Sequence, residues 1–174
     1  MKTDSILQQL RGEKVLRMIR SMRELNFRAL TDVYCDNEEI LGHHDQSPES
    51  RLDAEQEFYR YLKEVFFCTS EACYAVWARD GRYLAALRIE PYRDGLLIAA
   101  LETAPGARGN GYATALLSAV LQKFNNRIFY SHVRKDNITS LRVHEKCGFI
   151  CVSDSAVMLS GSVTLSHCTL CFGM

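Results

Sequence analysis

Apolar and polar residues follow a helical period in the first third of the chain and form β-type runs afterwards. Residues 13–36 place apolar side chains at helical spacing with arginines between them, at Val15, Ile19, Met22, Leu25, Ala29 and Val33. This stripe predicts one amphipathic helix or two short ones. After a loop at 42–50, Ser47 and Pro48 suit the N-cap and first position of a second helix. Its apolar stripe is expected at Phe58, Tyr61, Leu62 and Val65.

Three β-type runs begin at Cys73 and are separated by two Asp-Gly pairs. The pairs are Asp80-Gly81 and Asp94-Gly95. Asp-Gly is a strong hairpin signal, because both central residues of a type I′ turn need positive φ. The pattern therefore predicts a three-stranded antiparallel meander.

The remaining segments alternate between helical and strand patterns. A helix with the apolar stripe Leu116, Leu117, Val120, Leu121 and Phe124 precedes an expected strand at 127–133. Residues 137–147 predict a further helix, and residues 149–159 and 163–172 a closing antiparallel pair. The order predicts an α/β fold with a mixed, mostly antiparallel central sheet flanked by helices. With 174 residues, the chain is most simply a single domain over 1–174.

Composition and charge exclude several classes of function. Lysine plus arginine and aspartate plus glutamate both number 21, so no long-range attraction to a nucleic acid is expected. No stretch approaches the roughly 20 apolar residues that span a bilayer, and the start lacks the apolar core of a signal peptide. The seven cysteines are an odd number scattered through expected helices and strands. The cysteines indicate reduced thiols, as in a cytoplasmic protein. The charge balance and the lack of long apolar stretches indicate that neither a nucleic acid nor a membrane is a partner.

The stretch RGNGYATALL, residues 108–117, places two glycines at the expected start of a helix. The first turn of a helix has unpaired N–H groups and positive potential, so anions bind there. Gly109 and Gly111 would let an anionic group approach the backbone, and Arg108 adds a positive charge. A phosphate-bearing ligand is therefore expected.

Three phosphate-binding loops can be compared with this stretch. A P-loop needs a lysine that is missing here, and a dinucleotide fingerprint needs glycine or alanine where Thr114 stands. The pattern Arg/Gln-x-x-Gly-x-Gly/Ala is matched at every fixed position by Arg108, Gly111 and Ala113.

With this loop, the sequence resembles the GNAT superfamily of acetyl-CoA-dependent N-acetyltransferases. LETAPGARGNGYATALL is similar to that family's strand, pyrophosphate loop and helix, and Asn137-x-x-Ser-x-x-x-His144-Glu-Lys-x-Gly-Phe is similar to its second motif. The two motifs together cover about residues 96–150. The resemblance implies a helical acceptor-side segment over 1–70 and a sheet and cofactor-binding core over 71–174.

The resemblance also implies which residues hold acetyl-CoA. Backbone N–H groups would hold the pyrophosphate, from Arg108, Gly109, Asn110, Gly111, Tyr112 and Ala113. Leu101 and Thr103 would pair with the pantetheine arm through their main chain. Asn137 would hydrogen-bond to the arm, with Ser140 on the same helix face because three residues separate them.

The expected catalytic residues are His144 and Glu102. His144 stands where the family often has a tyrosine that protonates the departing thiolate. The alternative interpretation is that His144 lies partly exposed on its helix and has no catalytic role. Glu102 is the only carboxylate in the strand that leads into the loop, and it would be the base that takes the amine's proton. It can equally be a solvated or salt-bridged glutamate, and His132 is the reserve base.

The cysteines, histidines and acidic residues outside the two motifs are explained without a catalytic or metal-binding role. Cys168 and Cys171 would leave opposite faces of a strand, and the neighbouring residues His43, His44 and Asp45 suit a surface loop, so no metal is expected. Cys147 and Cys151 suit buried thiols. The acidic run Asp36, Glu38 and Glu39 suits a solvated face, although acid there could favour a cationic amine.

The sequence thus predicts an acetyltransferase that moves an acetyl group from acetyl-CoA to a primary amine by direct attack in a ternary complex. A non-catalytic domain that binds or senses acetyl-CoA and a nucleotide-binding module are the alternatives. The acceptor is a small-molecule or peptide amine that the sequence does not specify. A homodimer formed through the apolar closing strands is a further expectation.

Overall fold

A computed structural model of the chain describes residues 13–41 and 47–173. The N-terminal half contains β1 (Val15–Ile19), α2 (Phe27–Val33), α3 (Glu38–Leu41), α4 (Pro48–Glu64) and the 3₁₀ turn η1 (Phe66–Cys68). The meander consists of β2 (Cys73–Arg79), β3 (Arg82–Tyr92) and β4 (Gly95–Thr103). The rest contains η2 (Pro105–Ala107), α5 (Tyr112–Lys123), β5 (Phe129–Arg134), α6 (Ile138–Lys146), β6 (Ile150–Ser153), β7 (Ala156–Val157), β8 (Val163–Thr164) and β9 (His167–Phe172).

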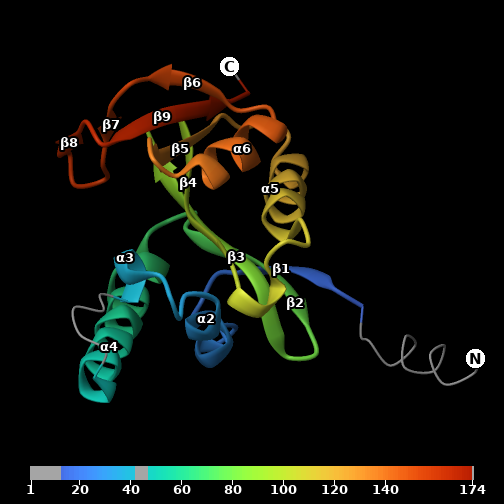
Figure 1. Cartoon of the computed structure of the whole chain (residues 1–174), viewed down its shortest axis with the longest axis vertical. Helices are drawn as coiled ribbons and strands as arrows, with labels where there is room; N and C mark the ends of the chain where they lie inside the picture. The colour runs from blue at the N-terminus through green and yellow to red at the C-terminus, as the bar shows by residue number, and fades with distance from the viewer. Residues whose placement is uncertain (1–12, 42–46, 174) are drawn as a thin grey trace, which may run out of the picture.

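Seven strands form one sheet in the order β1-β2-β3-β4-β5-β9-β6, and β7 and β8 form a separate two-stranded sheet. All neighbouring strands of the large sheet are antiparallel except β4 and β5, which are parallel. Helices α5 and α6 lie along the upper part of the sheet, and α2, α3 and α4 lie beside its lower part (Figure 1). The predicted mixed, mostly antiparallel sheet flanked by helices is confirmed.

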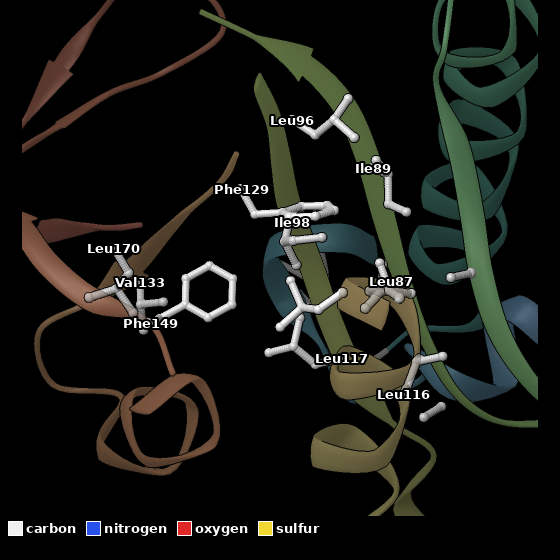
Figure 2. Close-up of a cluster of buried hydrophobic side chains, with 14 of the residues drawn as sticks. Leu87, Ile89, Leu96, Ile98, Leu116, Leu117, Phe129, Val133, Phe149 and Leu170 are labelled. Carbon is white, nitrogen blue, oxygen red and sulfur yellow. The ribbon is translucent and has the colours of Figure 1, made fainter. Parts of the chain in front are cut away.

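Two apolar clusters fix the helices to opposite faces of the sheet. One joins α5 to β3, β4, β5 and β9, and the other joins α2 and α4 to β2 and β3. In the first cluster, Leu116 and Leu117 of α5 lie near Leu87 of β3, while Phe149 lies with Val133 and Leu170 (Figure 2). The central strands β2 and β3 are thus buried on both faces.

The prediction of a helix over 13–36 is wrong for its first part. Residues 15–19 form β1 and pair antiparallel with β2, from Val15 opposite Ala78 to Ile19 opposite Tyr74. Leu16 and Met18 pack against the α5 side, whereas Ile19 packs against the α2 side. A short isolated helix is only marginally stable, whereas the edge of β2 offers a full set of hydrogen bonds.

Helix α4 begins as predicted but ends earlier. The Ser47 side chain accepts a hydrogen bond from Ser50 N at 3.2 Å, and Pro48 is the first helical residue. Phe58 and Leu62 are buried, whereas Val65 is 54% exposed and follows the last helical residue. Val65 therefore does not belong to the buried stripe in which the pattern placed it.

The meander is confirmed, and its two turns differ. Asp80 and Gly81 have φ values of 51° and 75°, as a type I′ turn requires. In the second hairpin Tyr92 pairs with Gly95, so the left-handed residue is Arg93 with φ of 50°, and Gly95 already lies in β4. The prediction of an Asp-Gly turn is wrong there. Glycine is needed for a close approach, since a Cβ on Gly95 would lie 2.3 Å from Ile128 O.

Strand β4 separates from β5 at its end. The two strands pair only at Leu96–Ile98 with Phe129–Ser131. On its other side, β4 changes register against β3, because Ala86 pairs with Glu102 but Arg88 pairs with Ala99. The extra residue forms a β-bulge, where Ala100 has a left-handed φ of 51°. The bulge and the divergence open the sheet next to the glycine loop.

The predicted closing pair is present with one addition. β9 pairs with β6 on one side and with β5 on the other, so it lies inside the sheet and β6 forms the edge. The chain between β6 and β9 adds the small β7–β8 hairpin, which the sequence pattern did not separate from the strands.

Candidate active site

The glycine loop leads directly into the N-terminus of α5. Gly109 and Gly111 have φ values of 76° and 75°, and Gly111 is the N-cap residue of the helix. No side chain caps this helix, and a Cβ on either glycine would meet no atom of the described chain within 4 Å. The N–H groups of the first turn therefore have no side-chain cap at the positive end of a twelve-residue helix, an arrangement that can bind anions.

A cleft of about 280 Å³, here termed the loop cleft, lies between this loop, the end of β4 and α6. Nine of the ten residues predicted to bind the cofactor line it, namely Leu101, Thr103, Arg108, Gly109, Gly111, Tyr112, Ala113, Asn137 and Ser140. Asn110 instead stabilises the loop, since its Nδ2 donates to Ala107 O and Arg108 O, each at 3.0 Å. Sequence reasoning missed Thr114, Thr139 and Val143, whose only signal was their helical spacing from the motif residues.

Arg108 is held by carboxylates. Its guanidinium donates to both oxygens of Asp36, at 2.7 and 2.8 Å, and to Glu102 Oε1 at 3.1 Å. Its Nε also donates to Thr103 O at 3.2 Å. The hydrogen bonds from Arg108 lower the pKa of Asp36. Arg108 therefore clamps the loop to β4 and to the segment after α2, in addition to supplying charge.

Helix α6 carries the second motif on the wall of the same opening. Asn137 is its N-cap, and Asn137 Oδ1 accepts from Ser140 N at 3.0 Å. This leaves the Asn137 amide NH₂ as a donor. Asn137, Ser140 and His144 all line one cleft, as their spacing predicts.

His144 is buried rather than partly exposed. Its side chain is 1% exposed, and its Nδ1 lies 2.8 Å from Ser140 O. A carbonyl only accepts, so Nδ1 carries the proton and Nε2 carries a lone pair. Nε2 is buried and has no hydrogen-bond partner in the described part of the chain. Burial lowers the pKa of His144 from 6.5, so the neutral form, an acceptor at Nε2, prevails at neutral pH.

Glu102 lies at the centre of a polar network. Its carboxylate accepts from Arg108 and, at 3.1 Å, from Asn37 Nδ2. It lines both the loop cleft and the larger opening beside it. The salt-bridged alternative therefore describes Glu102 in this structure, and a base role would require it to act from within these contacts.

His132 faces the opposite side of the sheet from the α5 cluster. Its Nδ1 lies 3.1 Å from Thr169 Oγ1, and its ring meets Tyr92 edge-on at 5.1 Å between centroids. Burial lowers the pKa of His132. Its Nε2 has no hydrogen-bond partner among the residues that the structure describes.

Two further clefts lie beside the loop cleft along β4. A central cleft of about 640 Å³ lies where β4 and β5 diverge, and it shares Leu101, Glu102, Arg108, Asn137 and Ser140 with the loop cleft. A far cleft of about 430 Å³, lined also by Met158 and Leu159, shares Ala99, Ala100 and His132 with the central cleft. The central cleft is therefore the neighbour of both other clefts, and it includes the β4 bulge residue Ala100 in its lining.

The structure also places the cysteines and the other residue types that can bind metals. No group of three or more His, Cys, Asp or Glu side chains there could hold a metal ion. Cys168 and Cys171 pack into different apolar clusters, on opposite faces of β9 as predicted. Cys151 is exposed and Cys147 is half-buried, so the prediction of buried thiols is wrong for this pair. His43, His44 and Asp45 lie outside the described residues.

Comparison with known families decides the identity of this arrangement. The model of the acetyltransferase (GNAT) family matches residues 30–149. The chain belongs to the GNAT family. This match includes the loop, the diverging strands and α6, and GNAT membership implies an acetyltransferase that uses acetyl-CoA. A comparison with curated protein sequences gives no match.

Solved structures with the same fold include several GNAT enzymes. A histone acetyltransferase HPA2 and related acetyltransferase from Corynebacterium glutamicum has a TM-score of 0.66 at 11% identity, with 91% of this chain and 94% of that chain covered. The ribosomal-protein-S18-alanine N-acetyltransferase from Escherichia coli has a TM-score of 0.60 at 13% identity, covering 91% and 92%. The PaiA N-acetyltransferase from Thermoplasma acidophilum, in complex with coenzyme A, has a TM-score of 0.59 at 12% identity, covering 90% and 98%.

The site of this GNAT protein fits the group that the family implies. The loop offers a helix N-terminus without a side-chain cap and, at Gly111, open space that lets an anionic group approach the backbone, as a pyrophosphate requires. The divergence of β4 from β5 leaves main-chain groups of Ala99–Thr103 without partners in β5, as an amide-bearing arm requires. Among the described residues, no helix combines the length and apolar character needed to span a bilayer.

Proposed function

We propose that this protein transfers the acetyl group of acetyl-CoA to a primary amine by direct attack in a ternary complex. The observation that carries the proposal is the set of three neighbouring clefts, of which the central cleft shares lining residues with both the loop cleft and the far cleft. A cofactor held at the loop and an acceptor entering from the far side would meet at the β4 bulge. None of the described residues lining these three clefts is a cysteine, so the clefts offer no thiol for an acyl-enzyme.

Most of the predicted cofactor residues have a proposed task. N–H groups of the 108–113 segment would hold the pyrophosphate, and Arg108 would keep the loop in place through Asp36. The main chain at Leu101 and Thr103 and the amide of Asn137 would bind the pantetheine arm. When bound, acetyl-CoA supplies an activated acyl group with a thiolate as its leaving group.

His144 is proposed to move the proton of the reaction. The amine must lose a proton as it bonds to the acetyl carbon, and the departing thiolate must gain one when the carbon–sulfur bond breaks. A neutral His144 can take the proton at Nε2 and return it to the sulfur, so one imidazole performs both transfers. Glu102 and His132 remain the other candidate bases. Glu102 is less available as a base, because its carboxylate already accepts hydrogen bonds from Arg108 and Asn37.

Carboxylates on the acceptor side support an amine that arrives as a cation. A cavity of about 730 Å³ beside the far cleft is lined by Glu39, Glu49, Asp53 and Glu57. Glu39 also lines the central and far clefts. Asp36 and Glu39 are paired with Arg108 and Arg134, so part of the acidic run is neutralised. Reversing the charges of Glu38 and Glu39 should raise the KM of a cationic amine and leave that of an uncharged amine unchanged.

The first experiment measures binding and turnover separately. Calorimetric titration with acetyl-CoA, with a dinucleotide as control, tests the loop, and release of free thiol with a panel of small amines and peptides tests transfer. Binding of acetyl-CoA followed by amine-dependent thiol release is expected. Binding without thiol release for every amine would favour the alternative of an acetyl-CoA sensor, which the ion-paired state of Glu102 supports. Tighter binding of the dinucleotide would overturn both.

A further inference from the structure

Ala100 has an unusual backbone conformation at the meeting point of two clefts. Its φ of 51° lies in the left-handed region, which residues with a Cβ rarely adopt. The residue lines both the central and the far cleft. Strained backbone persists only where its surroundings determine it, and such residues cluster at functional sites. The conformation of Ala100 therefore indicates that neighbouring residues hold it in place.

Tyr34 provides the contact that fixes this residue. Its hydroxyl donates to Ala100 O at 2.7 Å across 66 positions of sequence. The Tyr34 side chain is 0% exposed, and its ring meets Phe58 edge-on with 6.1 Å between centroids. As the C-cap of α2, it is also held by a hydrogen bond from its own N–H to Leu30 O. Burial raises the pKa of Tyr34, so the hydroxyl keeps its proton at working pH.

The hydrogen bond sets the direction of a whole peptide unit. A trans peptide is planar, so the carbonyl of Ala100 and the N–H of Leu101 point in opposite directions. With the carbonyl turned toward Tyr34, the N–H of Leu101 is turned away from it. Ala100 packs on the α2 side of the sheet, whereas Leu101 packs on the α5 side and lines the loop cleft.

We propose that Tyr34 is a positioning residue that aims the Leu101 N–H at the carbonyl oxygen of the bound thioester. A donor held there before reaction stabilises the charge that develops on that oxygen when the amine attacks. The proposal rests on the proposed function, because it assumes an acetyl group at the bulge. Tyr34 would act through the peptide and touch neither substrate.

Tyr83 offers a matched control. It is also buried, at 4% exposed, and its hydroxyl accepts from Asn26 N at 3.0 Å. It belongs to the same apolar cluster as Tyr34 but lines none of the three clefts. Tyr83→Phe thus removes a comparable hydroxyl without touching the bulge.

The test compares Tyr34→Phe with Tyr83→Phe in two measurements. In Tyr34→Phe the kcat is expected to fall about tenfold or more, because a misaligned donor is costly, while the KM for acetyl-CoA changes little. Tyr83→Phe should keep kcat within about twofold. The second measurement is the infrared carbonyl band of bound ¹³C-acetyl-CoA. We expect a lower frequency than for the free thioester in wild type and Tyr83→Phe, and a return toward the free value in Tyr34→Phe.

The two measurements separate this inference from the proposed function. A wild-type band shift that disappears in Tyr34→Phe supports the inference even if no amine is acetylated. Amine-dependent turnover with an unchanged band and kcat in Tyr34→Phe overturns the inference and leaves the proposed function standing. Absence of any band shift in wild type overturns it as well. Equal kcat losses in both variants would show a structural role only.

Discussion

Arg108 and Asp36 form a bidentate ion pair, with Nη1 of Arg108 2.7 Å from Oδ2 of Asp36 and Nη2 2.8 Å from Oδ1. The two residues are 72 positions apart in the sequence. The pair joins the loop before α5 to the segment between α2 and α3, so one contact holds together the proposed phosphate-binding loop and the proposed acceptor side of the site. Its geometry is that of a bidentate arginine–carboxylate contact, the strongest common form of surface ion pair.

Replacing Arg108 should weaken cofactor binding more than it destabilises the fold. The side chains of Arg108 and Asp36 are 45% and 47% exposed, so the pair contributes at most about 1 kcal/mol to stability. Arg108→Gln also removes the contact with Thr103 O and leaves the loop free to move. We expect the Kd for acetyl-CoA to rise about tenfold, measured by calorimetry. Arg127→Gln, which breaks the similar pair with Glu71 elsewhere, should leave that Kd unchanged.

Gly111→Ala should separate strain from ligand binding. Both Gly111 and Gly81 have φ of 75°, and a Cβ added to either would meet no atom of the described chain within 4 Å, but only Gly111 lies at the start of α5. Alanine at either position should cost about 1 kcal/mol of unfolding free energy. Only Gly111→Ala should lose affinity for acetyl-CoA, because Gly111 lines the loop cleft and its added methyl group would compete with the ligand there. Equal affinities of the two variants would contradict a phosphate site at this loop.

The sequence predicted the local parts of the site and missed their long-range connections. The glycine loop, the Ser47 cap and the Asp80-Gly81 turn follow from short spacings, which depend on local backbone chemistry. The ion pair of Arg108 and the hydrogen bond of Tyr34 could not be predicted, because their partners are brought close only by the sheet. Residues 15–19 were assigned to a helix for the same reason, since only the free edge of β2 makes them a strand.

The pH dependence of turnover tests the role of His144. Because burial lowers the pKa of His144, its neutral, proton-accepting form persists above pH 6.5 and is lost only at lower pH. With an acceptor amine that is neutral throughout, kcat/KM should fall as pH drops below about 6.5. His144→Gln should lower kcat by about 10²-fold or more and lose this acidic limb. Retention of the limb in His144→Gln would exclude the proton relay, and its loss in His132→Gln would assign it to that residue.

The pH dependence of the unfolding free energy should reflect the titration of His132 and His144. The pKa values of His132 and His144 are both lowered by burial from 6.5, so the unfolded chain binds protons that the folded chain rejects. Their contribution to stability is complete above the unfolded pKa and is lost as pH falls below it. The urea midpoint should therefore decrease from about pH 6.5 downward. In His144→Gln the decrease should be smaller, and an unchanged slope would contradict burial as its cause.

Gly95→Ala should destabilise the fold strongly. An added Cβ would lie 2.3 Å from Ile128 O, a backbone atom next to the first pair between β4 and β5. Relieving this clash requires the strands to move, at a cost of about 1–3 kcal/mol. Gly106→Ala, where a Cβ meets no described atom within 4 Å and φ is ordinary, should change the denaturation midpoint little. Similar midpoints for the two variants would contradict the close approach.

The interior position of β9 affects the order in which the protein can be assembled during synthesis. β5 and β6 are not neighbours, and only residues 167–172 bridge them. On the ribosome, the meander and its helices can form while the chain emerges, but the edge of β5 has no partner until β9 is made. Strand edges without partners invite association with other chains. Emergence of β9, rather than closure of the meander, is then the event that gives β5 its partner and ends this exposure.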